Sequence, residues 1–300
     1  MGGHKTMKFK MLLAATTGAC LLSTAAFATA APTPLPASCS GLPTHDQLAA
    51  QLKAAVGVAG NGGLGFNMWA TVVGNDGAVC AVAFSGNAYT DQWLASRVIS
   101  AQKAATANSL SLATVTGASS AGNLALASGN LYSADREGGS LFGLQFSNPV
   151  DPLDAYHQAG QPGTTPDPTT FGTTSDPMLG LPIGGINVFG GGLALYNAAG
   201  QKVGGLGVSG DTSCTDHYVA WRTRNGLKLD YLKTGHIAGP ASLFAGDATH
   251  PDNLIFDIPN NTQKVGPGHA PIEGNNAISP SGFGHPQCLN QPTGALPVVE

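Results

Sequence analysis

The residues that decide the fold are 193–226, LALYNAAGQKVGGLGVSGDTSCTDHYVAWRTRNG. Between two short apolar runs, 193–196 and 203–208, lie the turn residues Asn-Ala-Ala-Gly at 197–200. Apolar runs joined by so short a polar connection predict a tight antiparallel hairpin.

The spacing of apolar residues changes after this hairpin, from the pattern of a strand to that of a helix. Residues 209–211, Ser-Gly-Asp, interrupt the strand pattern. Ser213, Thr215 and Asp216 then offer oxygens for a helix N-cap, apolar residues recur at helical spacing, and Asn225-Gly226 supplies a stop. The stretch therefore predicts strand, turn, strand, glycine corner and helix.

The glycines of this corner also match a dinucleotide-binding pattern, GxGxxG, at Gly205, Gly207 and Gly210. The same pattern occurs at residues 60–65 ahead of a predicted strand, in a chain with 42 glycines. A dinucleotide site also needs a parallel βαβ unit, whereas a hairpin is predicted here. We therefore interpret the glycines as allowing a helix to pack closely on a sheet.

Charged residues make up only 10% of the 300 residues, and the net charge is −4. Basic residues do not cluster, so neither nucleic acid nor an anionic membrane is an expected partner. The length suits one domain with long appendages or two small domains.

The N-terminus has the pattern of a signal peptide. Lys8 and Lys10 precede an apolar run over 11–27, and residues 28–30 (Ala-Thr-Ala) form a cleavage site. Thr, Ser and Gly interrupt the apolar run, so we expect no membrane insertion after cleavage. The pattern predicts a periplasmic or secreted protein with a leader and signal peptide at 1–30.

Cleavage would leave four cysteines, Cys39, Cys80, Cys214 and Cys288. An even number in an oxidising compartment predicts two disulfides, with free buried thiols as the alternative. Three pairings are possible, and the sequence does not choose among them. Cys288 lies in a Pro/Gly-rich tail, so we expect its bridge to attach that tail to the core.

A first hairpin and two helices are predicted before the deciding stretch. Thr44 and Gln47 form a capping box that opens a helix running to residue 58. Apolar runs at 66–73 and 78–84 flank an Asp-Gly step, which predicts a hairpin. Alanine-rich residues 91–110 predict a second helix, and a shorter helix is predicted at about 115–127.

Two segments differ in amino-acid composition from the rest of the chain. Residues 128–192 and those after 234 are rich in Gly, Pro, Ser and Thr. Short strands are predicted within them at 141–146, 186–189 and 254–258. We predict a flexible segment at 31–43, a domain at 44–234 with an insertion at about 128–192, and a C-terminal extension at 235–300.

The order of these elements, together with three motifs, resembles the GlcG/HbpS family of haem-binding, haem-degrading-type domains. The motifs are ATVVGNDGAVCAVAF at 70–84, a KA-x-TA pattern at 103–107, and Gly191-Gly192-Leu193 followed by VGGLGVSG at 203–210 with Asp216 beyond it. They span roughly residues 44–230. The insertion, the tail and the cysteines depart from the compact family pattern and leave the pocket and its ligand open.

The resemblance implies an α+β fold: a profilin-like, five-stranded, mainly antiparallel sheet with packed helices. It also implies a homo-oligomer and a small-molecule ligand, with haem as the cofactor. Cofactor-binding candidates at the family motifs are Lys103, Gly191, Gly192, Ser209, Gly210 and Asp216.

Haem also requires a ligand to its iron. His217 lies beside Asp216, which can hold its tautomer, and His157 lies in the insertion, where a lid can bring it onto a ring. Both are candidate metal ligands, although a histidine in the first turn of a helix is more often solvated or capping. Lys103 either pairs a propionate or extends its ammonium to solvent.

A serine hydrolase is not predicted. Ser209 lies in GVSGD, where the nucleophile elbow G-x-S-x-G would require glycine instead of Asp211. A triad of Ser209, His217 and Asp211 would fall within nine residues, unlike the usual dispersed arrangement.

We therefore predict an exported small-ligand-binding protein that binds haem or a similar tetrapyrrole for carriage, sensing or slow degradation. Whether the ligand is turned over is left open. The alternative is a cofactor-free structural or partner-binding protein on the same scaffold.

Overall fold

The computed structural model describes residues 2–3, 34–115, 122–156, 166–232, 249–258 and 279–300. The predicted signal peptide lies outside the described residues apart from positions 2 and 3. The helices are α1 (His45–Val56), α2 (Ala95–Ser109), α3 (Leu131–Asp135), α4 (Pro152–Tyr156) and α5 (Ser213–Gly226). The strands are β1 (Trp69–Gly74), β2 (Val79–Phe84), β3 (Leu112–Val115), β4 (Gly122–Leu124), β5 (Gly192–Tyr196) and β6 (Lys202–Ser209).

Both predicted hairpins form, and they join edge to edge into one antiparallel sheet of order β2-β1-β6-β5. The joining pair is β1 with β6, in a register that places Ala70 opposite Val208. The α+β class is confirmed. Five strands were predicted, and among the described residues the sheet has four. Strands β3 and β4 form a separate ribbon, whose Leu112 and Leu124 carbonyl oxygens lie 3.1 Å from the Tyr196 hydroxyl.

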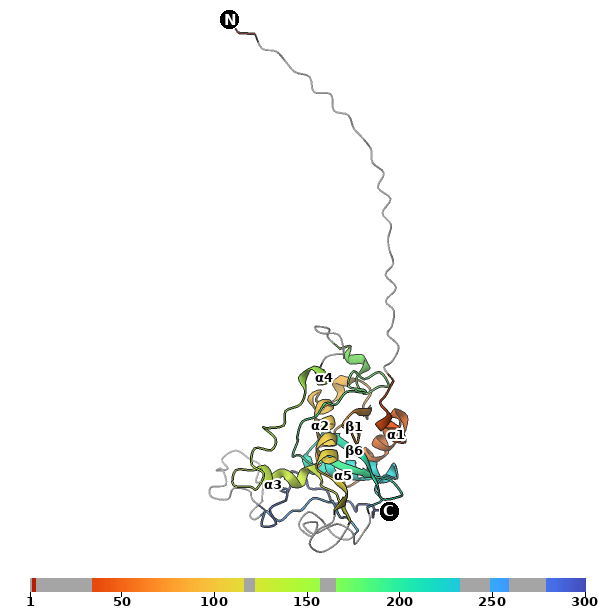
Figure 1. The fold of residues 1–300 in the computed structure, drawn as a ribbon, viewed down its shortest axis with the longest axis vertical. Helices are drawn as coiled ribbons and strands as arrows, with labels where there is room; N and C mark the ends of the chain where they lie inside the picture. The colour runs from red at the N-terminus through yellow and green to blue at the C-terminus, as the bar shows by residue number, and fades with distance from the viewer. Residues whose placement is uncertain (1, 4–33, 116–121, 157–165, 233–248, 259–278) are drawn as a thin grey trace. The chain divides into compact units, whose positions relative to one another are not determined.

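Helices cover both faces of the sheet (Figure 1). Thr71 and Val73 of β1 face α2, and the Thr71 hydroxyl lies 2.7 Å from that of Ser100. The alternate residues, Ala70 and Val72, pack into the main core with α1 and α5. This two-residue period follows from the pleat of a strand buried on both faces.

Glycines on β6 let α2 approach the sheet closely. A Cβ at Gly207 would lie 1.9 Å from the Ser100 carbonyl oxygen, and one at Gly205 would lie 2.3 Å from that of Ala104. Any side chain at either position would collide with the helix backbone. The structure thus confirms that these glycines serve helix packing.

The helix predictions need adjustment at their ends. The Thr44 and Gln47 capping box is confirmed at the start of α1. Helix α2 begins at Ala95, later than predicted, because residues Tyr89–Asp91 form a separate 3-10 turn. The N-cap of α5 is Thr212, one residue before the predicted candidates.

Several element predictions outside this core were wrong. The helix expected at 115–127 is replaced by parts of β3 and β4, because β-branched and glycine residues there disfavour a helix. Residues 141–146, 186–189 and 254–258 form turns or irregular backbone. The run at 186–189 is instead used for packing, because Ile186 and Val188 are buried against Leu131.

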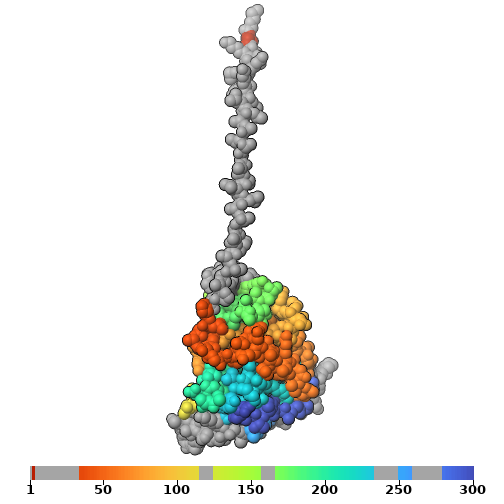
Figure 2. All heavy atoms as spheres, turned by 90° about the vertical axis from the view of Figure 1, so that its right-hand side faces the viewer, coloured from red at the N-terminus to blue at the C-terminus, as the bar shows by residue number. Residues whose placement is uncertain are grey.

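The insertion and the C-terminal extension are attached to the core by buried ion pairs. The Arg97 side chain on α2 donates to Asp176 in the insertion, with Nε 2.9 Å from Oδ2. Arg224 on α5 donates to Asp252 in the extension at 2.5 and 2.7 Å. The last residues of the chain, blue in Figure 2, lie beside the cyan segment that contains α5, where the Trp221 indole donates to the Pro297 carbonyl.

Two disulfides are present, Cys39 with Cys80 and Cys214 with Cys288. Of the three pairings that the sequence left open, the structure selects this one. The second bridge attaches the C-terminal extension to α5, as expected for Cys288. Within the described part of the chain, no helix is both long and apolar enough to cross a membrane.

The close contact at Gly207 yields the first prediction. Gly207→Ala should lower the free energy of unfolding by about 3 kcal/mol, because the added methyl group forces α2 away from β6. Urea denaturation monitored by circular dichroism measures this change.

The control is Gly57→Ala, because a Cβ there makes only ordinary contacts of 3.5 Å or more and φ is −72°. A Gly207→Ala protein as stable as the wild type would contradict the role given to β6.

Candidate ligand site

The family motifs converge on a cavity of about 270 Å³ between the N-terminal ends of α2 and α5. It is lined by Trp93, Ser96, Ile99, Phe189, Ser209, Asp211, Ser213 and Asp216. Hollows of about 480 and 640 Å³ lie elsewhere and contain none of the predicted site residues. The smaller cavity is therefore the candidate site.

Two aromatic side chains flank this cavity. Trp93 is 56% exposed and Phe189 is 44% exposed, although burial of large apolar side chains normally stabilises the folded state. The Trp93 ring is supported by an edge contact with Phe66 at 5.3 Å between centroids. The cavity mouth therefore presents apolar ring surface to solvent.

Glycines shape the backbone around the cavity. Gly191 has φ of +109°, and a Cβ there would lie 2.3 Å from the Val208 carbonyl oxygen. Gly210 lies at the corner between β6 and α5, where a Cβ would lie 2.4 Å from the Asn67 carbonyl oxygen. These two motif glycines are thus required by backbone geometry, and Gly192 meets the Lys103 carbonyl oxygen in the same way, at 2.5 Å.

A buried ion pair forms the floor of the site. Lys103 Nζ lies 2.7 Å from Asp216 Oδ2 and 3.0 Å from the Val208 carbonyl oxygen. The backbone N–H of Asp211 donates to Asp216 Oδ1 at 2.8 Å. Lys103 therefore points inward, and its ammonium does not extend to solvent.

Burial dominates the electrostatics of this pair. It raises the pKa of Asp216 to about 6, and the neighbouring Lys103 charge limits the rise. Burial also lowers the pKa of Lys103, against the opposing attraction of Asp216. The pair is held together by direct contact in a medium that disfavours both charges.

His217, a predicted metal ligand, lies beside the site but does not line the cavity. Its side chain is fully buried, with its ring 6.0 Å from that of Trp221 between centroids. Within the part of the chain that the structure describes, neither ring nitrogen has a partner at good hydrogen-bond geometry, and the nearby Asn253 side chain favours the charged form of the ring. Burial, aided by Arg224, lowers its pKa to about 3, so the ring is neutral at pH 7. His157 lies outside the described residues.

The structure brings Lys103, Gly191, Ser209, Gly210 and Asp216 together, as expected of one motif set. The sequence reasoning missed Trp93, Ile99, Phe189 and Ser213. A usable signal existed for two of them. Trp93 lies outside the apolar stripe of the predicted alanine-rich helix, and Phe189 precedes the glycine run of the family motif.

One group of ligand-type side chains also lies near the site. The donor atoms of Cys214, His285 and Cys288 lie within 4.8 Å of one another. The two sulfur atoms form the disulfide, so they are not thiolate ligands in this state.

No family model matches the chain, and no curated protein matches it significantly. Two solved structures are similar in fold. One is the crystal structure of Klebsiella pneumoniae protein ORFY, of family DUF336, with 22% identity and a TM-score of 0.37. The match covers 61% of this chain and 86% of the ORFY chain. The other is the crystal structure of a PduOC:heme complex, with 19% identity and a TM-score of 0.37. The match covers 60% of this chain and 89% of the PduOC chain. The predicted resemblance to the GlcG/HbpS family agrees with this match to a DUF336 structure, which is a likeness of fold at low identity.

The buried carboxyl yields the second prediction. The pKa of Asp216 is raised from 3.8 to about 6, so the folded state holds this proton more tightly than the unfolded state. Its contribution to stability is complete below pH 3.8 and is lost as the pH rises through about 6. The unfolding free energy of the wild type minus that of Asp216→Asn should fall by about 3 kcal/mol between pH 4 and 7.

Urea denaturation of both proteins across this pH range measures the difference. Lys103→Met should move the titration of the Asp216 carboxyl carbon, followed by NMR, to higher pH, because the neighbour that limits the rise is gone. A difference in stability that stays constant or increases with pH would be inconsistent with a buried, perturbed carboxyl.

Proposed function

We propose that this chain is an exported small-ligand-binding protein that holds a flat, largely apolar ligand at the Trp93 and Phe189 cavity. The observation that carries the proposal is the pair of exposed aromatic side chains flanking a hollow whose floor is already neutralised. Exposed rings of this kind bind planar ligands by stacking and by burial of apolar surface.

The floor of the site supports an uncharged or apolar ligand surface. The Asp216 carboxylate is paired with Lys103, and the Asp211 carboxylate accepts backbone N–H groups from Leu64 and Phe66. Both carboxylates therefore already have partners, and neither requires a cationic ligand. Selection of the ligand therefore rests on shape and on the aromatic rings.

Haem is the tetrapyrrole to test first, because the sequence resembles a haem-binding family. The described cavity lining fits a flat ring but contains no His, Cys, Met or Tyr to ligate its iron. The cavity volume of about 270 Å³ also lies just below the usual range of small-molecule sites, so a large ring would be held by one edge. We derive no iron chemistry from this arrangement, and carriage is the role that it supports best.

Export is proposed from the predicted signal peptide together with the two disulfides, since such bonds persist in oxidising compartments. A periplasmic or secreted location follows. Homo-oligomerisation, implied by the family resemblance, stays a prediction.

The stacking proposal yields the third prediction. Haemin and metal-free protoporphyrin IX should each saturate near one equivalent, with dissociation constants within about threefold of each other, because stacking does not involve the metal. Trp93→Ala should weaken binding of both by roughly tenfold. Tryptophan fluorescence quenching and Soret absorbance measure both titrations.

The control variant is Phe146→Ala, which removes an aromatic side chain that is 83% exposed in the insertion, outside the cavity lining. Absence of saturation by either porphyrin would reject the proposal and favour the cofactor-free, partner-binding alternative.

The fourth prediction concerns the iron ligand. His217→Ala should leave the Soret spectrum of the haemin complex unchanged, because that ring is buried away from the cavity lining. His157→Ala tests the other candidate by the same absorbance measurement. A shifted Soret band in His217→Ala would show that the ring reaches the iron and that the site rearranges on binding.

A further inference from the structure

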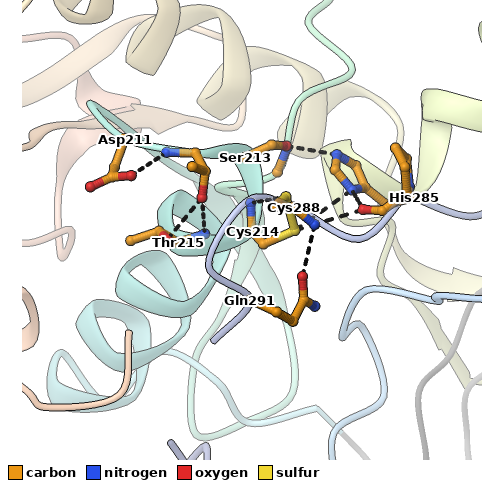
Figure 3. The surroundings of a disulfide bond; sticks show 10 residues. Asp211, Ser213, Cys214, Thr215, His285, Cys288 and Gln291 are labelled. Carbon is orange, nitrogen blue, oxygen red and sulfur yellow. Dashed lines mark hydrogen bonds between the residues drawn. A yellow bond between two sulfur atoms is a disulfide. The ribbon is translucent and has the colours of Figure 1, made fainter. Parts of the chain in front are cut away.

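A serine and a histidine from distant parts of the chain meet at the cavity. Ser213 is the first residue of α5 and lines the cavity, and its Oγ lies 2.7 Å from Nε2 of His285 in the C-terminal extension (Figure 3). His285 is only 3% exposed. The two residues are 72 positions apart, so only the tertiary fold brings them together.

The hydrogen bonds of His285 fix the direction of this contact. Its Nδ1 lies 2.6 Å from the Pro286 carbonyl oxygen, which can only accept, so Nδ1 carries the proton. Burial lowers the pKa of His285 to about 4, so the ring is neutral at pH 7. In the neutral ring Nε2 must then accept, and the Ser213 hydroxyl donates to it.

A second contact orients the serine oxygen. The backbone N–H of Gly190 donates to Ser213 Oγ at 2.5 Å, so the hydroxyl hydrogen is directed at His285. Ser213 also lies at the N-terminus of a 14-residue helix, where the helix dipole favours a negative charge developing on this oxygen. A serine that donates to a neutral imidazole and lines a cavity has the arrangement of an activated nucleophile.

We propose that Ser213 and His285 form a nucleophile and general-base dyad that takes acyl groups from small, uncharged esters entering the cavity. The Pro286 carbonyl takes the orienting place that a carboxylate occupies in a triad. This activity is independent of flat-ligand binding, although both use the same hollow.

The reaction balances with water as the only co-reactant. Ser213 Oγ attacks the ester carbonyl carbon as its proton passes to His285 Nε2. The bond between the carbonyl carbon and the alkoxy oxygen of the ester then breaks, and the leaving alcohol takes the proton from His285. Water, deprotonated by the same nitrogen, hydrolyses the acyl-serine to release the carboxylic acid and restore the serine.

The cavity defines the substrate class. Its volume of about 270 Å³ admits a short acyl or aryl group, and Trp93, Ile99 and Phe189 provide apolar contacts. The carboxylates of Asp211 and Asp216 line the same hollow and are already paired, so the lining offers no cationic group to bind an anionic ester. Short-chain neutral esters are therefore the expected substrates.

A disulfide holds the two halves of the dyad together. Cys214 follows Ser213 directly, and its partner Cys288 lies three residues after His285. The Cys214 backbone N–H also donates to Cys288 Sγ at 3.1 Å. The bridge thus fixes the extension at the point where His285 contacts the serine (Figure 3).

Covalent labelling tests the dyad directly. The full chain is incubated with a fluorophosphonate probe, which loses fluoride as a serine oxygen bonds to phosphorus, and the labelled peptide is identified by mass spectrometry. We expect one label per chain on Ser213, none there in Ser213→Ala, and at least hundredfold slower labelling in His285→Gln. Hydrolysis of p-nitrophenyl acetate should fall in parallel in both variants.

Ser175→Ala is the control, because that serine is exposed and outside the cavity lining. Near-UV circular dichroism establishes that each variant is folded. Absence of label on Ser213 in the folded wild type, or a rate unchanged in folded His285→Gln, would overturn the proposal. Loss of porphyrin binding with labelling intact would reject only the flat-ligand proposal.

The role of the bridge is tested by a matched pair of double variants. Cys214→Ser with Cys288→Ser should slow labelling at least tenfold, whereas Cys39→Ser with Cys80→Ser should label at the wild-type rate, because that bridge joins the N-terminal 3-10 turn to β2 and neither cysteine adjoins Ser213 or His285. Equal labelling rates in the two folded double variants would show that the disulfide does not position His285.

Discussion

The close approach of α2 to β6 is the constraint on which the rest of the structure depends. Glycines at 205 and 207 leave no side chain at these positions between the strand and the helix backbone, and Lys103 reaches past the end of β6 to Asp216 on α5. The two helices lie on opposite faces of the sheet, and this ion pair links them at the end of β6. A bulkier strand would separate the helices and leave two buried charges without partners, which costs several kcal/mol.

The same link defines the chemical character of the cavity. Because the Asp216 carboxylate is satisfied by Lys103 and by a backbone N–H, the floor is polar in composition but offers little unpaired charge. Exposed rings of Trp93 and Phe189 then dominate the entrance. A cavity with a paired carboxylate at its floor and exposed aromatic rings at its entrance suits ligands that are selected by shape.

Helix α5 connects this cavity to the C-terminal extension. Its first residues contribute Ser213 and Cys214, and its later residues hold Asp252 through Arg224 and Pro297 through Trp221. The extension is therefore part of the folded unit along the length of this helix. Its contribution to the cavity, His285, makes the extension a candidate functional segment as well as a structural cover.

The sequence by itself determined the two hairpins, the glycine packing and the family motifs, because apolar spacing, turn residues and glycine spacing are local signals. It failed for the helix predicted at about 115–127 and for the strand predicted at 186–189, whose apolar side chains serve packing instead of strand pairing. Only the tertiary structure decided the disulfide pairing, the burial of His217 and the meeting of Ser213 with His285. Those contacts join residues tens of positions apart, and no local pattern encodes a distance that arises only when the extension packs on α5.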